Sequence, residues 1–125
     1  MIYLDTHAVV WLRDGELDWL SASARREIER QDLFVSPMVI LELELLREIG
    51  RLRASSESIV SDLASKTGLR ICDFPFPLLV ALAVGENWTR DPFDRLIVGH
   101  ARANDESPLL TMDKEILKNY KRAIC

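Results

Sequence analysis

The sequence predicts an α/β protein in which helices cover a parallel sheet. Short apolar runs alternate with longer segments of helical periodicity along the whole chain. A chain of 125 residues has the length of one domain, and it can bury a sizeable core without disulfides or a structural metal. We therefore expect a single domain over residues 1–125.

The strands of this sheet are expected where the apolar runs are too short for a helix and are followed by turn or cap signals. They are predicted at residues 2–4, 33–35, 69–72 and 109–111, with a small edge strand at 123–124.

Caps and helix breakers place the helices between these strands. The first helix is expected to end before the turn pair Asp14-Gly15, and Ser21 is the predicted N-cap of the next. Ser36, followed by a proline, begins a helix that ends at Gly50. Another helix is expected between the Ser55-Ser56 cap and Gly68, and the remaining helices over residues 78–84, 92 to about 103, and 113–120.

The strongest helix-start signal lies in residues 89–97. Asp91 is the expected N-cap, Pro92 takes the first helical position, and Asp94 follows the cap by three residues, as in a capping box. Asp94 is therefore either a second capping group or an acid with another role, and both interpretations stay open at this point.

Composition excludes several classes of protein. The chain is 48% hydrophobic and 29% charged, which disfavours disorder, and its net charge of −4 disfavours a protein that coats nucleic acid by bulk charge. Two cysteines, Cys72 and Cys125, are too few for a disulfide framework and are expected to be free thiols. We expect no secretory signal and no membrane span, and therefore a cytoplasmic protein.

Four acids occupy equivalent positions relative to the predicted elements. Asp5 directly follows the first strand and Asp113 the fourth, whereas Glu42 and Asp94 lie near the beginnings of helices. Because ligand sites in open parallel sheets lie beyond the carboxyl ends of the strands, the four carboxylates are expected in one crevice. Such a cluster needs protons or cations for charge balance, and oxygen ligands suit Mg²⁺ or Mn²⁺. The implied chemistry is hydrolysis of a phosphate ester, although helix capping explains some of the acids equally well.

Four motifs, in this order and spacing, give the chain a resemblance to a known family. They are Leu-Asp-Thr-His-Ala at residues 4–8, Val35-Ser36 followed by Glu42, Arg-Asp-Pro-Phe-Asp-Arg-Leu-Ile at 90–97, and Leu-Thr-Met-Asp at 110–113. Over nearly its full length the sequence resembles PIN-domain ribonucleases, in particular the VapC-type toxins of type II toxin–antitoxin pairs.

The resemblance implies a three-layer α/β/α fold with a central parallel sheet of four to five short strands. It also implies a metal-dependent endoribonuclease in which an acidic quartet, matched here by Asp5, Glu42, Asp94 and Asp113, binds one or two Mg²⁺ or Mn²⁺ ions. A water activated by the metal would be the nucleophile, and the products would carry 5′-phosphate and 3′-hydroxyl ends.

Further residues and partners follow from the same resemblance. Thr111 matches a position that supports the last acid and the scissile phosphate, and Asp91 matches an accessory acid. Thr6 belongs to the first motif, and Arg95, next to Asp94, is a candidate for a phosphate or carboxylate contact. The expected partners are an RNA substrate, a small VapB-like antitoxin whose tail occupies the active-site groove, and a second copy of the chain, with larger toxin–antitoxin assemblies as an extension.

The two histidines are expected to have structural or surface roles, and the three tryptophans are expected in packing or partner contacts. His7 and His100 have no partners in a recognisable catalytic triad. Trp88 is expected in a core or dimer contact rather than stacked on an RNA base, and Trp11 and Trp19 in packing or in the antitoxin groove.

Three alternative functions compete with the predicted toxin ribonuclease. A solitary RNA-processing nuclease would have the same site without an antitoxin, and a non-catalytic binding module would have kept only the fold. A phosphatase of the haloacid-dehalogenase type is disfavoured, because His7 stands where that family needs a second aspartate. The sequence does not indicate which RNA is cleaved.

Overall fold

A computed structural model describes all residues from Met1 to Cys125 and confirms the α/β prediction. It contains a five-stranded sheet, and every strand pairing in this sheet is parallel. The strands are β1 (Ile2–Leu4), β2 (Leu33–Val35), β3 (Arg70–Ile71), β4 (Leu109–Leu110) and β5 (Ala123–Ile124). The helices are α1 (Thr6–Asp14), α2 (Ala22–Arg30), α3 (Pro37–Glu48), α4 (Ser56–Thr67), α5 (Phe76–Ala83), α6 (Pro92–Ala103) and α7 (Lys114–Asn119).

The strand order β3-β2-β1-β4-β5 puts β1 at the centre of the sheet. The chain adds β2 and β3 on one side of β1, then returns to add β4 and β5 on the other, so the order reverses between β1 and β4. Leu4 at the end of β1 pairs with Leu110 at the end of β4. The carboxyl ends of these two strands therefore lie side by side at the topological switch point, where ligands bind in open parallel sheets.

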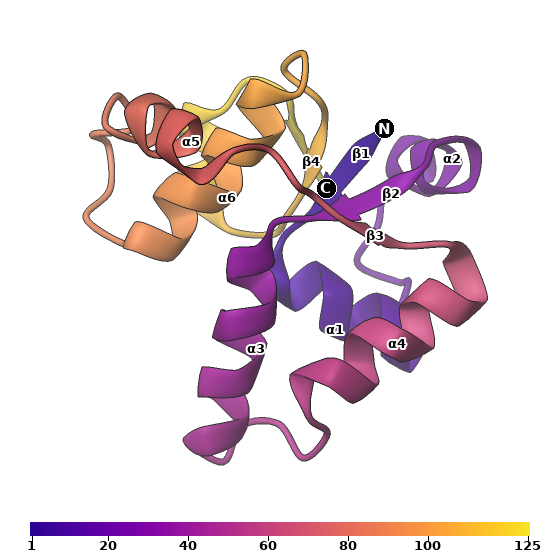
Figure 1. Cartoon of the computed structure of the whole chain (residues 1–125). Helices are drawn as coiled ribbons and strands as arrows, with labels where there is room; N and C mark the ends of the chain where they lie inside the picture. Colours follow the sequence, from indigo (N-terminus) through magenta and orange to yellow (C-terminus); the bar gives the residue numbers. More distant parts are fainter.

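Helices lie on both sides of the sheet (Figure 1). The α1, α3 and α4 helices pack against one another on one side, and α6 lies on the other side with α5 packed against it (Figure 1). Because helices cover both faces, the residues of β1 and β4 are completely buried. This explains why these strands are continuous apolar runs without polar alternation. No helix combines the length and apolar character that a membrane span requires.

Proline accounts for the largest difference between the predicted and observed helices. The helix predicted over residues 78–84 begins at Phe76, with Pro75 as its N-cap residue and Pro77 in its first turn. The N–H groups of the first turn have no acceptor within the helix, so proline, which lacks an N–H, is tolerated there. The helix therefore begins earlier than predicted. The predicted strands at 69–72 and 109–111 are each shorter in the structure, where the paired residues are Arg70–Ile71 and Leu109–Leu110.

Candidate active site

A pocket of about 460 Å³ opens beyond the carboxyl ends of β1 and β4. Five of its eight lining residues are acids, and no lysine or arginine lines it. The lining residues are Asp5, His7, Trp11, Glu42, Asp91, Asp94, Met112 and Asp113. The structure therefore brings together the four acids of the predicted quartet and the accessory acid.

Asp5 and Asp113 are tied together by the hydroxyl of Thr111. Thr111 Oγ1 donates to Asp5 Oδ2 at 2.7 Å and accepts from the Asp113 N–H at 3.0 Å. Thr111 and Asp5 are both buried, and Asp5 Oδ1 also accepts from the Thr6 N–H at 2.8 Å. Burial raises the pKa of Asp5, while these hydrogen bonds act in the opposite direction. The Asp5 carboxylate is thus held in one orientation at the bottom of the pocket.

Glu42 reaches the pocket from the second turn of α3. The buried Thr6 hydroxyl, at the beginning of α1, donates a hydrogen bond to Glu42 Oε1. Burial raises the pKa of Glu42, the hydrogen bond from Thr6 opposes that shift, and the charge of Asp5 adds to it. Thr6 therefore fixes Glu42 in the same way that Thr111 fixes Asp5.

The predicted capping box at the beginning of α6 does not form. Asp91 Oδ1 caps the helix by accepting from the N–H groups of Phe93, at 2.8 Å, and Asp94, at 3.4 Å. The Asp91 N–H, which a capping box would give to the Asp94 carboxylate, donates instead to Thr89 Oγ1 at 3.1 Å. Because Asp91 alone provides the cap, the Asp94 carboxylate is free to face the pocket.

Asp94 is in an unfavourable electrostatic environment. Burial, followed by the negative charges of the other four acids of the pocket, raises its pKa from 3.8 to about 7. Asp113 is better stabilised, since its Oδ1 accepts from the N–H groups of Glu115 and Ile116 at the beginning of α7.

The donor set of the pocket fits a hard divalent cation. Five carboxylates face one space without a lysine or arginine, and oxygen ligands of this kind suit Mg²⁺ or Mn²⁺. No three of the candidate ligands are close enough together to form a ready-made metal site.

Not every residue that the sequence suggested is part of the pocket. Arg95 is turned away from it, because its Nε donates to the Thr89 carbonyl at 2.8 Å and its side chain lines a separate apolar hollow with Val80 and Leu96. His100 is buried, with Nδ1 lying 2.7 Å from Ser36 Oγ, and burial lowers its pKa to about 4.

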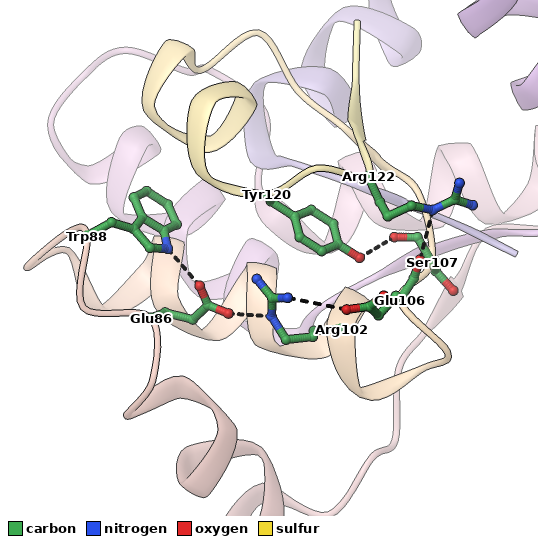
Figure 2. Close-up of polar contacts among 7 residues, drawn as sticks. All are labelled: Glu86, Trp88, Arg102, Glu106, Ser107, Tyr120 and Arg122. Carbon is green, nitrogen blue, oxygen red and sulfur yellow. Dashed lines mark hydrogen bonds and ion pairs between the residues drawn. The ribbon is translucent and has the colours of Figure 1, made fainter.

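Two further residues line the pocket: His7, for which the sequence predicts a structural or surface role, and Trp11, for which it predicts packing or the antitoxin groove. They are spaced four residues apart on α1, which begins immediately after Asp5, so they project from the same face of that helix. This spacing is the signal that could have identified them. Trp88, by contrast, lies outside the pocket and donates its indole N–H to the buried Glu86 carboxylate at 2.6 Å (Figure 2).

Comparisons with known proteins agree with this fold. The family model described as "PIN domain" matches residues 2–122. Among solved structures, the chain is similar to VapBC2 from Rickettsia felis, determined bound to a DNA fragment from their promoter. The match has a TM-score of 0.65 at 21% identity and covers 99% of this chain and 96% of the other. No curated protein matches the chain.

Proposed function

The chain belongs to the PIN-domain family, and on that premise we propose that it is a metal-dependent endoribonuclease, the toxin of a type II toxin–antitoxin pair acting in the cytoplasm. The observation that carries the proposal is the meeting of acids from separate segments in one pocket at the switch point of the sheet. PIN-domain nucleases are hydrolases that act on nucleic acids and generally use divalent metal ions.

Asp5, Glu42, Asp94 and Asp113 would hold one or two Mg²⁺ or Mn²⁺ ions. When bound, such an ion would orient a phosphodiester, promote deprotonation of a water and offset the charge on the leaving oxygen. The hydrolysis adds the water oxygen to phosphorus and breaks the bond to the 3′ oxygen, which gives 5′-phosphate and 3′-hydroxyl ends.

The remaining residues of the site position the quartet. The Thr111 hydroxyl keeps one Asp5 oxygen turned toward β4, and Thr6 holds Glu42 beside it. These contacts keep the carboxylates in place before a cation or substrate arrives, and preorganised ligands of this kind support catalysis.

The toxin role requires an antitoxin, and the acidic pocket suits the tail of such a partner. Five carboxylates without a basic neighbour would attract a segment that carries lysine or arginine, and a bound tail would exclude RNA from the pocket.

We propose α5 as the surface on which two copies of the chain meet. Leu79 and Ala83 are buried, but the other large apolar side chains of this segment are exposed: Phe76, Leu78, Val80, Leu82 and Val84. An exposed apolar patch of this kind marks an interface. Leu78→Glu should convert a dimer to a monomer in analytical ultracentrifugation, whereas a monomeric wild type would contradict the assignment.

RNA cleavage by the purified protein tests the main proposal. The wild type should cleave RNA with Mg²⁺ or Mn²⁺ and lose this activity in a chelator, and Asp5→Asn and Asp94→Asn should abolish it. Asp32→Asn, which changes an exposed acid outside the pocket, is the matched control and should cleave normally. Unchanged cleavage in both pocket variants would sink the proposal.

Two further measurements separate the alternatives. A non-catalytic binding module should show no uptake of Mn²⁺ that depends on the carboxylates in isothermal titration. A solitary RNA-processing nuclease would lack a short open reading frame that lies immediately upstream and overlaps the gene.

A further inference from the structure

Trp11 differs from the other two tryptophans of the chain. Trp19 and Trp88 pack against the hydrophobic core, and their indole N–H groups donate to the Glu16 carbonyl and the Glu86 carboxylate, respectively. Trp11 is half-buried but does not pack against the core cluster, and its indole N–H has no hydrogen-bond partner. In Figure 2 the Trp88 indole N–H donates to the Glu86 carboxylate, which also pairs with Arg102. Core packing and a hydrogen bond therefore hold two of the tryptophans, whereas Trp11 packs on the Trp19 ring outside the core cluster and keeps an unpaired indole N–H.

Trp11 lies where two pockets meet. Together with Met112 it lines both the acidic pocket and a second pocket of about 820 Å³, whose walls are formed by the segment from Gly15 to Trp19 and by Arg25. The Trp11 ring lies 5.9 Å from the His7 ring on the acidic side and 4.8 Å from the Trp19 ring on the other side, centroid to centroid. A row of three aromatic rings thus leads from the carboxylates into the second pocket.

We propose that Trp11 stacks against an unpaired base of the RNA, next to the phosphodiester that the acidic pocket holds, and that the second pocket is the subsite for this base. The inference rests on the proposed ribonuclease function, because the acids fix where the cleaved bond lies.

The chemistry of the second pocket favours a base over a phosphate. Its only cation, Arg25, is already engaged, since Nη2 donates to the Leu17 carbonyl at 2.7 Å and lies 3.8 Å from Asp18 Oδ1. Glu16 and Asp18 add negative charge to the walls. What remains is the Trp11 side chain, which lines both pockets and has an unpaired indole N–H, and these features suit a nucleobase, which presents a π-face and carbonyl acceptors.

The same features favour RNA over a protein segment as the occupant. A substrate whose phosphodiester lies at the carboxylates must place the adjoining nucleotide beside the pocket, and Trp11 and Met112 are shared by the two spaces. Unpaired bases that protein aromatics stack upon are the usual targets of RNA recognition.

Cleavage of a short unpaired RNA of mixed sequence, with Mn²⁺, tests the proposal. Trp11→Leu should raise KM about tenfold, within the roughly 5- to 140-fold that stacking of one base is worth, with a smaller effect on kcat. Trp11→Phe keeps a ring but loses the N–H, and its KM should fall between those of the wild type and the leucine variant. Trp88→Phe, which removes an indole outside both pockets, is the control and should keep the wild-type KM.

An abasic substrate distinguishes stacking from a general disturbance of the site. An abasic nucleotide next to the cleaved bond should raise KM for the wild type and raise it no further for Trp11→Leu, because both changes remove the same contact. Fully additive losses would overturn the proposal.

Direct binding keeps this inference separate from the ribonuclease proposal. The same RNA, with Ca²⁺ in place of Mn²⁺ to offset the charge of the carboxylates, should quench the tryptophan fluorescence of the wild type more than that of Trp11→Phe. A wild type that shows this quenching but no cleavage would overturn the proposed reaction and support the base subsite. Normal cleavage with an unchanged KM in Trp11→Leu would overturn the subsite and leave the second pocket to a protein partner.

Discussion

Replacing Asp94 by asparagine should stabilise the metal-free protein while it abolishes RNA cleavage. The pKa of Asp94 is raised to about 7 because its carboxylate is partly buried and faces four other acids. Asparagine has nearly the same shape without the charge, so the variant removes the repulsion and leaves the packing intact. Stability and activity should therefore change in opposite directions.

The magnitude follows from the shift in pKa. A rise in the pKa from 3.8 to about 7 means that the folded protein disfavours the ionised form of Asp94, relative to the protonated form, by roughly 4 kcal/mol. Asp94 is partly exposed, and solvent screening reduces this to about 1–2 kcal/mol. The folded protein holds its proton more tightly than the unfolded chain does, so the wild type loses stability as the pH rises from about 4 to 7. Above about pH 7 the loss is complete.

Urea denaturation in a chelator, at about pH 8 and about pH 4.5, measures this effect. Asp94→Asn should be more stable than the wild type by about 1–2 kcal/mol at the higher pH and nearly equal at the lower pH. Addition of Mn²⁺ should stabilise the wild type more than the variant, because ligand binding to the folded state adds stability. An Asp94→Asn variant that is less stable than the wild type at the higher pH would refute the reasoning, and Asp32→Asn should show no such gain.

Three further outcomes follow from individual contacts. Burial lowers the pKa of His100 from 6.5 to about 4, so the unfolded chain takes up a proton first and the contribution of His100 to stability falls by up to about 3 kcal/mol as the pH drops from 6.5 toward 4. Because Asp94 changes stability in the opposite direction over this range, the effect is measured as the difference between the wild type and His100→Asn in urea titrations, which should move against the wild type by up to that amount as the pH falls. Glu86→Ala leaves the guanidinium of Arg102 without its buried partner and should lower the free energy of unfolding by about 3 kcal/mol (Figure 2). Glu106→Ala removes the exposed carboxylate that also pairs with Arg102 and should lower it by less than about 1 kcal/mol. Thr111→Val removes the hydroxyl that orients the first acid and should reduce RNA cleavage about 10- to 100-fold with little change in circular dichroism; full activity would show that this hydrogen bond is dispensable.

The sequence was sufficient to predict the sheet because its central strands are buried on both faces. Ile2, Tyr3 and Leu4 have almost no exposed surface, and a strand of this kind must be apolar at every position. The ends of the edge strand β3 were harder to predict, because Leu69 and Cys72, which flank the paired positions, are apolar and buried although they lie outside the strand.

The candidate site was predictable as a set of acids, but not as a set of contacts. Asp5 and Asp113 follow soon after a strand, Asp94 lies in the first turn of a helix and Glu42 lies one turn further into its helix, which a linear pattern can show. The hydrogen bond from Thr6 to Glu42 joins residues 36 positions apart, and that from Thr111 to Asp5 joins residues 106 apart, so neither is visible as a local signal. Arg95 illustrates the opposite error, because adjacency to Asp94 did not place its side chain in the same pocket.

Helix capping and function, which stood as competing explanations of the acids, are combined in this structure. Asp5, Asp91 and Asp113 are the N-caps of α1, α6 and α7, and all three carboxylates also line the pocket. Three helix N-termini therefore face the same space, and each offsets the crowded negative charge by roughly 0.3–1 kcal/mol. Capping by itself does not require an acid, because serine and asparagine cap helices as well as aspartate does, and serine is the N-cap of α2, α3 and α4 in this chain. The three capping serines do not line the pocket, whereas the three capping aspartates do. The choice between serine and aspartate as the cap therefore follows the charge of the pocket.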